Sequence, residues 1–183
     1  KDVDSRALID FAAVHNSNND FALNGPQNIK ANLRNYWCNG TPLPPLKSSS
    51  TEAEVNENFG EFTSTVTKLL VLQESKGYGE LIRNIKEGNI EKISPTDEIT
   101  KALFNIDMDA EGSNSVRSRQ KAEAEDKEAS NIYKAGSVVV FKNLKKNKFG
   151  IMIIRSVNVD FDAVKATNDA NATITFDLYY QRY

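Results

Sequence analysis

Residues 137–157 of the chain read SVVVFKNLKKNKFGIMIIRSV, and residues 172–180 read ATITFDLYY. The first stretch holds two runs rich in β-branched and apolar residues, 137–141 and 149–157, which are typical of β-strands. A polar turn at 143–148 separates them. The third run alternates between apolar and polar side chains, and one face carries Ile174, Phe176, Leu178 and Tyr180. Polar links between consecutive strands predict an antiparallel three-strand meander.

A further strand signal lies near the start of the chain. Residues 7–14 form a short apolar run, which ends at the turn-forming residues 15–20. An isolated strand needs partners, so we expect it to join the C-terminal meander in one antiparallel sheet.

The middle of the chain carries helix signals. Thr51 and Glu54 have the spacing of a capping box, and Gly88 and Pro95 stand where a helix end and a helix start are expected. Apolar spacing predicts helices over 62–73, 78–85 and 99–106, although β-branched residues in the first of these favour a strand. The sequence therefore predicts an α+β fold in which helices from the middle of the chain cover one face of the sheet.

Composition limits the classes of function. The chain has 183 residues, 39% hydrophobic and 26% charged, which predicts one globular domain over residues 1–183. Residues 107–131 have few large apolar side chains and predict a charged surface insertion. The net charge of -2 argues against nucleic acid as a partner. No apolar run is long enough to predict a transmembrane segment.

Candidate catalytic and metal-binding residues are few. His15 and Cys38 are the only histidine and cysteine. The neighbours of Cys38 supply no cation or base, and His15, at a strand end among Asn and Ser residues, fits a turn histidine better than a catalytic one. Asp107, Asp109 and Glu111 alternate as in a calcium loop, but Ser118 occupies the position where that loop needs a bidentate glutamate. We therefore expect no enzymatic activity and no cofactor, with a looser calcium site at these three residues as one possibility. A hydrolase using a pair of carboxylates is an alternative.

Three aromatic residues are candidates for ligand binding. Tyr36, Trp37 and Tyr179 combine apolar ring faces with polar tips, which suits a sugar or peptide surface. Packing in the core or on the sheet is the competing interpretation. If the rings are exposed, a glycan-binding module is the alternative function that they indicate.

The C-terminal strands also resemble a known group of domains. The segments at 136–142, 148–153 and 174–181 are similar to the C-terminal strands of exported Bacteroidetes lipoprotein domains, including the HmuY-like haem-binding proteins. The opening residues 9–12 look like the first strand of such domains. This resemblance covers about a third of the chain and implies an exported protein, at the cell surface or in the periplasm, with a lipid anchor at an N-terminal region that precedes Lys1. It does not carry over haem ligands, because His15 is the only histidine.

The long polar segments 16–35, 39–50 and 107–131 exceed simple connections, and such loops are often functional. We therefore expect a non-enzymatic binding or assembly module that meets a protein or glycan at the cell envelope through its loops.

Overall fold

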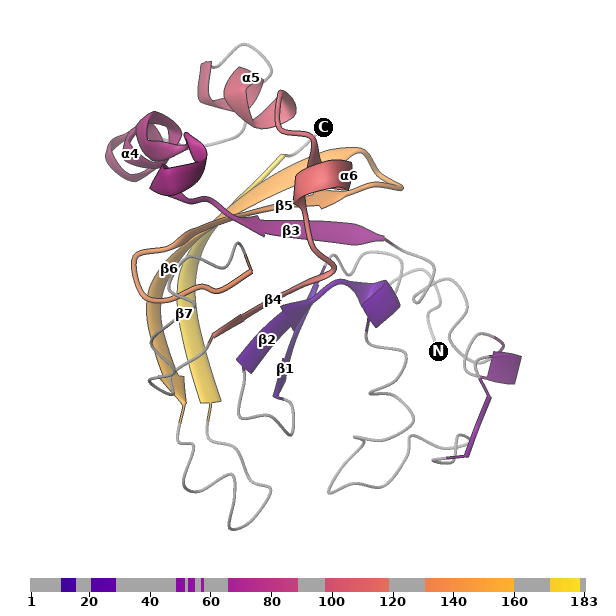
Figure 1. The fold of residues 1–183 in the computed structure, drawn as a ribbon. Helices are drawn as coiled ribbons and strands as arrows, with labels where there is room; N and C mark the ends of the chain where they lie inside the picture. Colours follow the sequence, from indigo (N-terminus) through magenta and orange to yellow (C-terminus); the bar gives the residue numbers. More distant parts are fainter. Residues whose placement is uncertain are drawn as a thin grey trace.

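The structure is a computed structural model that describes residues 11–15, 21–28, 49–51, 53–54, 57, 66–88, 98–118, 131–159 and 172–181. The helices and strands follow the chain in this order (Figure 1): β1 Ala12–His15, β2 Phe21–Asn24, β3 Thr67–Val71, the 3₁₀ helix η1 Glu74–Lys76, α4 Gly79–Glu87, α5 Glu98–Phe104, α6 Met108–Glu111, β4 Ser115–Ser118, β5 Val138–Asn143, β6 Lys148–Val159 and β7 Ala172–Tyr180.

The predicted C-terminal meander is confirmed. Strands β5, β6 and β7 pair antiparallel in sequence order, and β3 extends them to a four-stranded sheet of order β3-β5-β6-β7. The turn between β5 and β6 is held by the Asn143 side chain, whose Oδ1 accepts from the Lys146 amide at 3.0 Å. Asn147 takes a positive φ of 50°, which asparagine tolerates better than most residues.

The N-terminal strand lies in a different sheet from the one we expected. β1 pairs antiparallel with β2, and β2 pairs with β4, which gives a second, three-stranded sheet of order β1-β2-β4. Only five residues separate β1 from β2, so a local hairpin costs less chain entropy than pairing with the distant meander. The predicted α+β class is confirmed, with two antiparallel sheets instead of one. Residues 7–10 of the predicted strand lie outside the described residues.

The helix expected over 62–73 is wrong in its described part, because 67–71 form strand β3. Leu69 and Val71 belong to the core on one face of the four-stranded sheet, and Leu70 belongs to the core on the other face. Residues 69–71 of β3 are apolar and buried on both faces of the sheet, so this run resembles part of a buried helix. The β-branched residues were the better guide.

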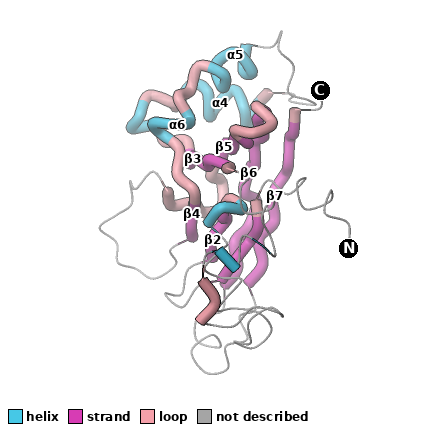
Figure 2. The backbone as a smooth tube through the Cα atoms, turned by 90° about the vertical axis from the view of Figure 1, so that its right-hand side faces the viewer, coloured by secondary structure: helices cyan, strands magenta, loops and turns pink. Residues whose placement is uncertain are grey.

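The four-stranded sheet lies between two layers. One face packs against α4, α5 and α6, through a core that includes Ile85, Leu103 and Met108. The other face packs against the three-stranded sheet, through Leu23 of β2 and Val116 of β4. Figures 1 and 2 both place the three helices together on one side, as expected for helices that cover a sheet face.

The two sheets are joined at the edge of β3. The backbone of Ser113 exchanges two hydrogen bonds of 2.7 Å with Leu69, and the Gln27 side chain bonds the amide and the carbonyl of Thr67 at 3.3 and 3.4 Å. Gly25 lies so close that a Cβ there would be 2.6 Å from the Thr67 carbonyl oxygen. The outward-facing groups of β3 at these two residues are therefore satisfied from within the chain.

The segment 107–118 departs from the expected surface insertion. It forms α6 and β4, and the side chains of Met108 and Val116 are 2% and 0% exposed. Two well-placed apolar residues were enough to anchor a segment that is otherwise polar. The highly charged part of the predicted insertion, 119–130, lies outside the described residues.

Candidate functional site

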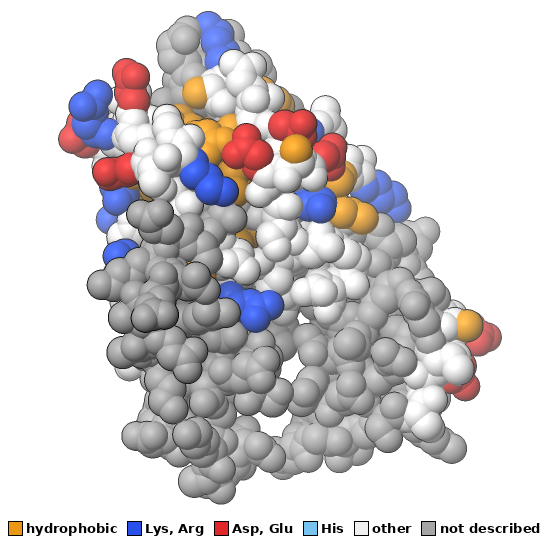
Figure 3. Space-filling model, viewed as in Figure 1, with side chains coloured by type: hydrophobic (Ala, Val, Ile, Leu, Met, Phe, Trp, Pro, Cys, Tyr) orange, Lys and Arg blue, Asp and Glu red, His pale blue; other side chains and the backbone are white. Residues whose placement is uncertain are grey.

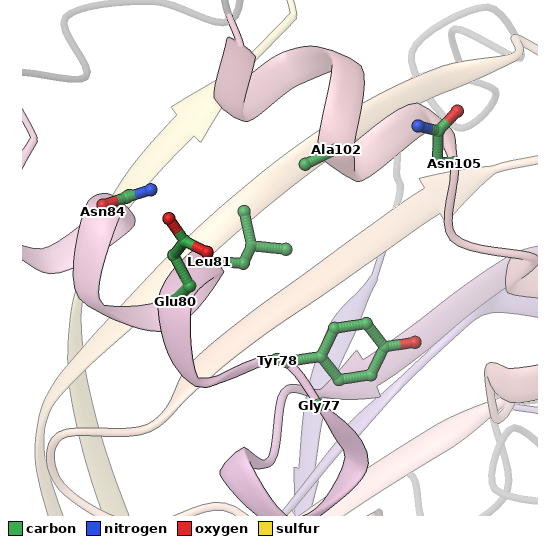
Figure 4. Close-up of a pocket in the computed structure, with 7 residues that line it drawn as sticks. All are labelled: Gly77, Tyr78, Glu80, Leu81, Asn84, Ala102 and Asn105. Atoms are coloured by element: carbon green, nitrogen blue, oxygen red, sulfur yellow. The ribbon is translucent and has the colours of Figure 1, made fainter.

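A pocket of about 370 Å³ opens between α4 and α5 (Figure 4). Its lining comes from the turn before α4, from α4 itself and from the end of α5, and consists of Gly77, Tyr78, Glu80, Leu81, Asn84, Ala102 and Asn105. The volume is at the small end of the range for ligand sites, about 300–1,000 Å³, and suits one or two small rings.

The amphipathic character of α4 explains why the pocket has polar and apolar sides. Ile82 and Ile85 are buried against the four-stranded sheet, and Leu81 is half-buried beside them. Glu80 and Asn84 are one helical turn apart, so they share an exposed face that turns toward α5 (Figure 4). Gly88 caps the helix and its amide donates to the Asn84 carbonyl, as its position in the sequence predicted.

Gly77 and Tyr78 form the turn that leads into α4. Gly77 takes a φ of 85°, the left-handed conformation that glycine adopts without steric cost, and ends η1. This turn places the half-buried Tyr78 ring at one end of the pocket (Figure 4).

The Tyr78 hydroxyl is fixed by a carboxylate on α6. It donates a hydrogen bond of 2.5 Å to Glu111 Oε2. Burial, followed by this hydrogen bond and the charge of Glu111, raises the pKa of Tyr78 to about 12. The phenol therefore remains protonated at neutral pH and acts as a fixed donor, which holds its ring in place beside the pocket.

The pocket combines an apolar floor with a polar rim. Leu81 and Ala102 contribute aliphatic surface from the two helices, and Figure 3 shows apolar side chains reaching the surface between the helices, with acidic side chains nearby. Glu80, Asn84 and Asn105 are exposed at the rim. Such a site suits a ligand with an apolar face and hydrogen-bonding groups around it.

A second hollow, of about 400 Å³, lies on the other side of α4 and has a different character. Its lining includes Arg83, Lys86, Glu74 and Glu87, so charges of both signs surround it. These side chains are exposed, and this hollow has less apolar floor for a ligand to cover.

The predicted aromatic residues do not meet at this pocket. Tyr36 and Trp37 lie outside the described residues, and so does Cys38. Tyr179 is half-buried and packs against the core on the helix side of the four-stranded sheet. For Tyr179 the packing interpretation agrees with its contacts.

The three predicted calcium ligands have other roles. Asp107 is the N-cap of α6, where its Oδ1 accepts from the amides of Asp109 and Ala110 at 3.1 Å each. Glu111 bonds Tyr78, and Asp109 is exposed. Within the described parts of the chain, no three Asp, Glu, His or Cys side chains gather closely enough to hold a metal ion.

Sequence reasoning missed the pocket residues because their pattern had a simpler explanation. The spacing of Tyr78, Leu81, Ile82 and Ile85 indicated a helix face packed on a core, and two of these residues also line the pocket. The polar residues Glu80, Asn84 and Asn105 carried no motif. The sequence showed only that these polar residues flank the apolar stripe of a helix. They line a pocket because α5 lies opposite α4, and sequence spacing does not show that arrangement.

The part of the chain that the structure describes contains no helix with the length and apolar character needed to cross a membrane. Comparison of the chain with protein-family models, with curated proteins and with solved structures returned no match.

Proposed function

We propose that this chain is a non-catalytic binding module and that the pocket between α4 and α5 takes a small carbohydrate unit. One observation carries the proposal: an aliphatic floor, an oriented tyrosine ring, two carboxamides and one carboxylate line the same small pocket. Sugars present apolar ring faces and a periphery of hydroxyl groups, and this set of side chains matches both features.

The lining favours binding over catalysis. Among the described residues that line the pocket, Glu80 is the one carboxylate, and the hydroxyl of Tyr78 is engaged by Glu111. Glycoside hydrolysis by the usual route needs two carboxyl groups about 5–10 Å apart across the substrate. A site with a single carboxylate is better suited to holding a sugar than to cleaving one.

The resemblance of the C-terminal strands to exported Bacteroidetes lipoprotein domains supports a place for this module at the cell envelope, where glycans are exposed. The near-neutral charge of the chain gives no electrostatic attraction toward nucleic acid, so it argues against that class of partner. The partner that we propose is therefore an envelope or environmental glycan.

The proposal is tested by isothermal titration calorimetry of the protein with a panel of neutral hexoses and N-acetylhexosamines. We expect the double variant Asn84→Ala/Asn105→Ala to lower the affinity for the tightest-binding sugar about tenfold, because each lost hydrogen bond contributes about 0.5–1.5 kcal/mol.

Arg83→Gln is the matched control, because Arg83 lies on α4 but lines the other hollow. It should leave the affinity unchanged, and circular dichroism should show all variants folded. Failure of every sugar in the panel to bind, or equal affinity of the wild type and the double variant, would contradict the proposal.

A further inference from the structure

We propose that the sugar unit recognised between α4 and α5 is an N-acetylated hexosamine, an inference that rests on the proposed carbohydrate-binding function. The acetamido group of such a sugar has three features: a methyl group, an amide donor and a carbonyl acceptor. The α4 side of the pocket offers a partner for each.

The methyl group is matched by the floor. Figure 4 shows Leu81 extending from α4 into the space beneath α5, and Ala102 supplies a methyl group from α5. Both side chains are half-buried, so a small apolar group placed between them would lose contact with water. Among the described lining residues Tyr78 is the one aromatic ring, so the floor beside Glu80 and Asn84 is aliphatic and suits a methyl group.

The amide of the ligand is matched by two neighbours of Leu81 on the same helix. Asn84 follows Leu81 by three residues and Glu80 by four, so all three side chains lie on adjacent parts of one helical surface. The Asn84 carboxamide can donate to the acetamido carbonyl, and the Glu80 carboxylate can accept from its N–H group. An amide that leaves water needs both of these bonds, and both partners stand beside the aliphatic floor.

The charge of the pocket further restricts the class of sugar that it would bind. Among the described residues of the lining, Glu80 is the one that carries a charge, and this charge is negative. An acidic sugar, such as a uronate or a sulfated hexose, would place a second negative charge beside it. When the acetamido group of an N-acetylated sugar lies against Asn84 and Glu80, the rest of its ring extends toward Asn105 and Tyr78, which Figure 4 places away from Asn84. Together these features select a neutral sugar that carries an N-acetyl group.

The test compares N-acetylglucosamine, glucose and glucuronate as ligands of the full chain by calorimetry and by saturation-transfer NMR. We expect N-acetylglucosamine to bind at least about tenfold more tightly than glucose, with its strongest saturation on the acetyl methyl group, and glucuronate to bind most weakly.

Ala102→Leu, which fills the floor with a residue that favours helix, should lower the affinity for N-acetylglucosamine to that for glucose. Arg83→Gln should preserve the preference. Equal binding of glucose and N-acetylglucosamine by the wild type would overturn this inference and leave the carbohydrate-binding function standing. Binding of no sugar by the folded wild type would overturn both.

Discussion

At the scale of single residues, Tyr78 links the pocket to the rest of the helical layer. Its ring lines the pocket, and its hydroxyl reaches across to Glu111 on α6. The aromatic residue visible in the sequence was interpreted as part of a helix face, and the structure adds the partner, 33 residues away, that sequence spacing could not supply. Because Glu111 is exposed, Tyr78→Phe should cost about 1 kcal/mol or less of the free energy of unfolding.

The same contact predicts the titration of Tyr78. Its pKa is raised from 10.0 to about 12 in the folded protein, so the protonated phenol stabilises the fold. This contribution is fully present below pH 10 and is lost as the pH rises through about 12. The tyrosinate absorbance of the wild type minus that of Tyr78→Phe should therefore rise near pH 12. A difference spectrum that titrates at the ordinary value for tyrosine would contradict the contact.

Two glycines give a second prediction at this scale. Gly150 lies opposite Phe141 in the β5–β6 pair, and a Cβ there would be 2.0 Å from the Phe141 ring. The ring packs against Phe11 and stacks on Tyr180. Gly150→Ala should displace it and destabilise the protein by about 1–3 kcal/mol. Gly79→Ala, whose Cβ would come no closer than 3.7 Å to its neighbours, should be neutral or stabilising. Thermal unfolding of the two variants measures the contrast, and equal melting temperatures would show that the ring tolerates the added methyl group.

At the scale of elements, local signals predicted well wherever one rule applied. The capping box is present, because Glu54 Oε2 accepts from the Thr51 amide at 2.6 Å and Thr51 Oγ1 accepts from the Glu54 amide at 3.3 Å. The alternation in β7 also holds for Ile174, Phe176 and Tyr180, which pack toward the same core, whereas Leu178 of the predicted face is 51% exposed. β3 could not be predicted with the same ease, since burial on both of its faces removes the alternation that marks a strand. The short β4 carried too weak a pattern within a polar segment.

The edge of β3 offers a test of how one element is held. Gln27→Ala removes two hydrogen bonds to the backbone of Thr67, so the Thr67 amide should exchange with solvent at least several-fold faster. The amide of Leu69, which bonds Ser113, serves as the internal reference. Asn28→Ala is the matched control, because Asn28 bonds the Asn24 side chain instead of β3. Unchanged exchange at Thr67 in Gln27→Ala would mean that this side chain does not protect the edge.

At the scale of the whole molecule, the division into two sheets was beyond the reach of sequence patterns. The sequence pattern of each strand in the meander is the same whether its second face packs against helices or against another sheet. The contacts that pack the two sheets together join residues far apart in the chain, such as Leu23, Val116 and Met152. The pocket depends on the same long-range arrangement, because it exists only where α5 packs beside α4. The packing of the three layers therefore positions the pocket, although no sequence pattern in any of the layers predicts it.

Chemical-shift mapping tests most directly whether the α4–α5 pocket holds a sugar. Titration of the isotope-labelled chain with N-acetylglucosamine and chitobiose should shift the backbone amides of 77–84 and 102–105, while those of β1 and β2 on the far side of the four-stranded sheet stay in place. Shifts confined to residues outside this pocket, or no shifts at saturating sugar, would contradict sugar binding between α4 and α5.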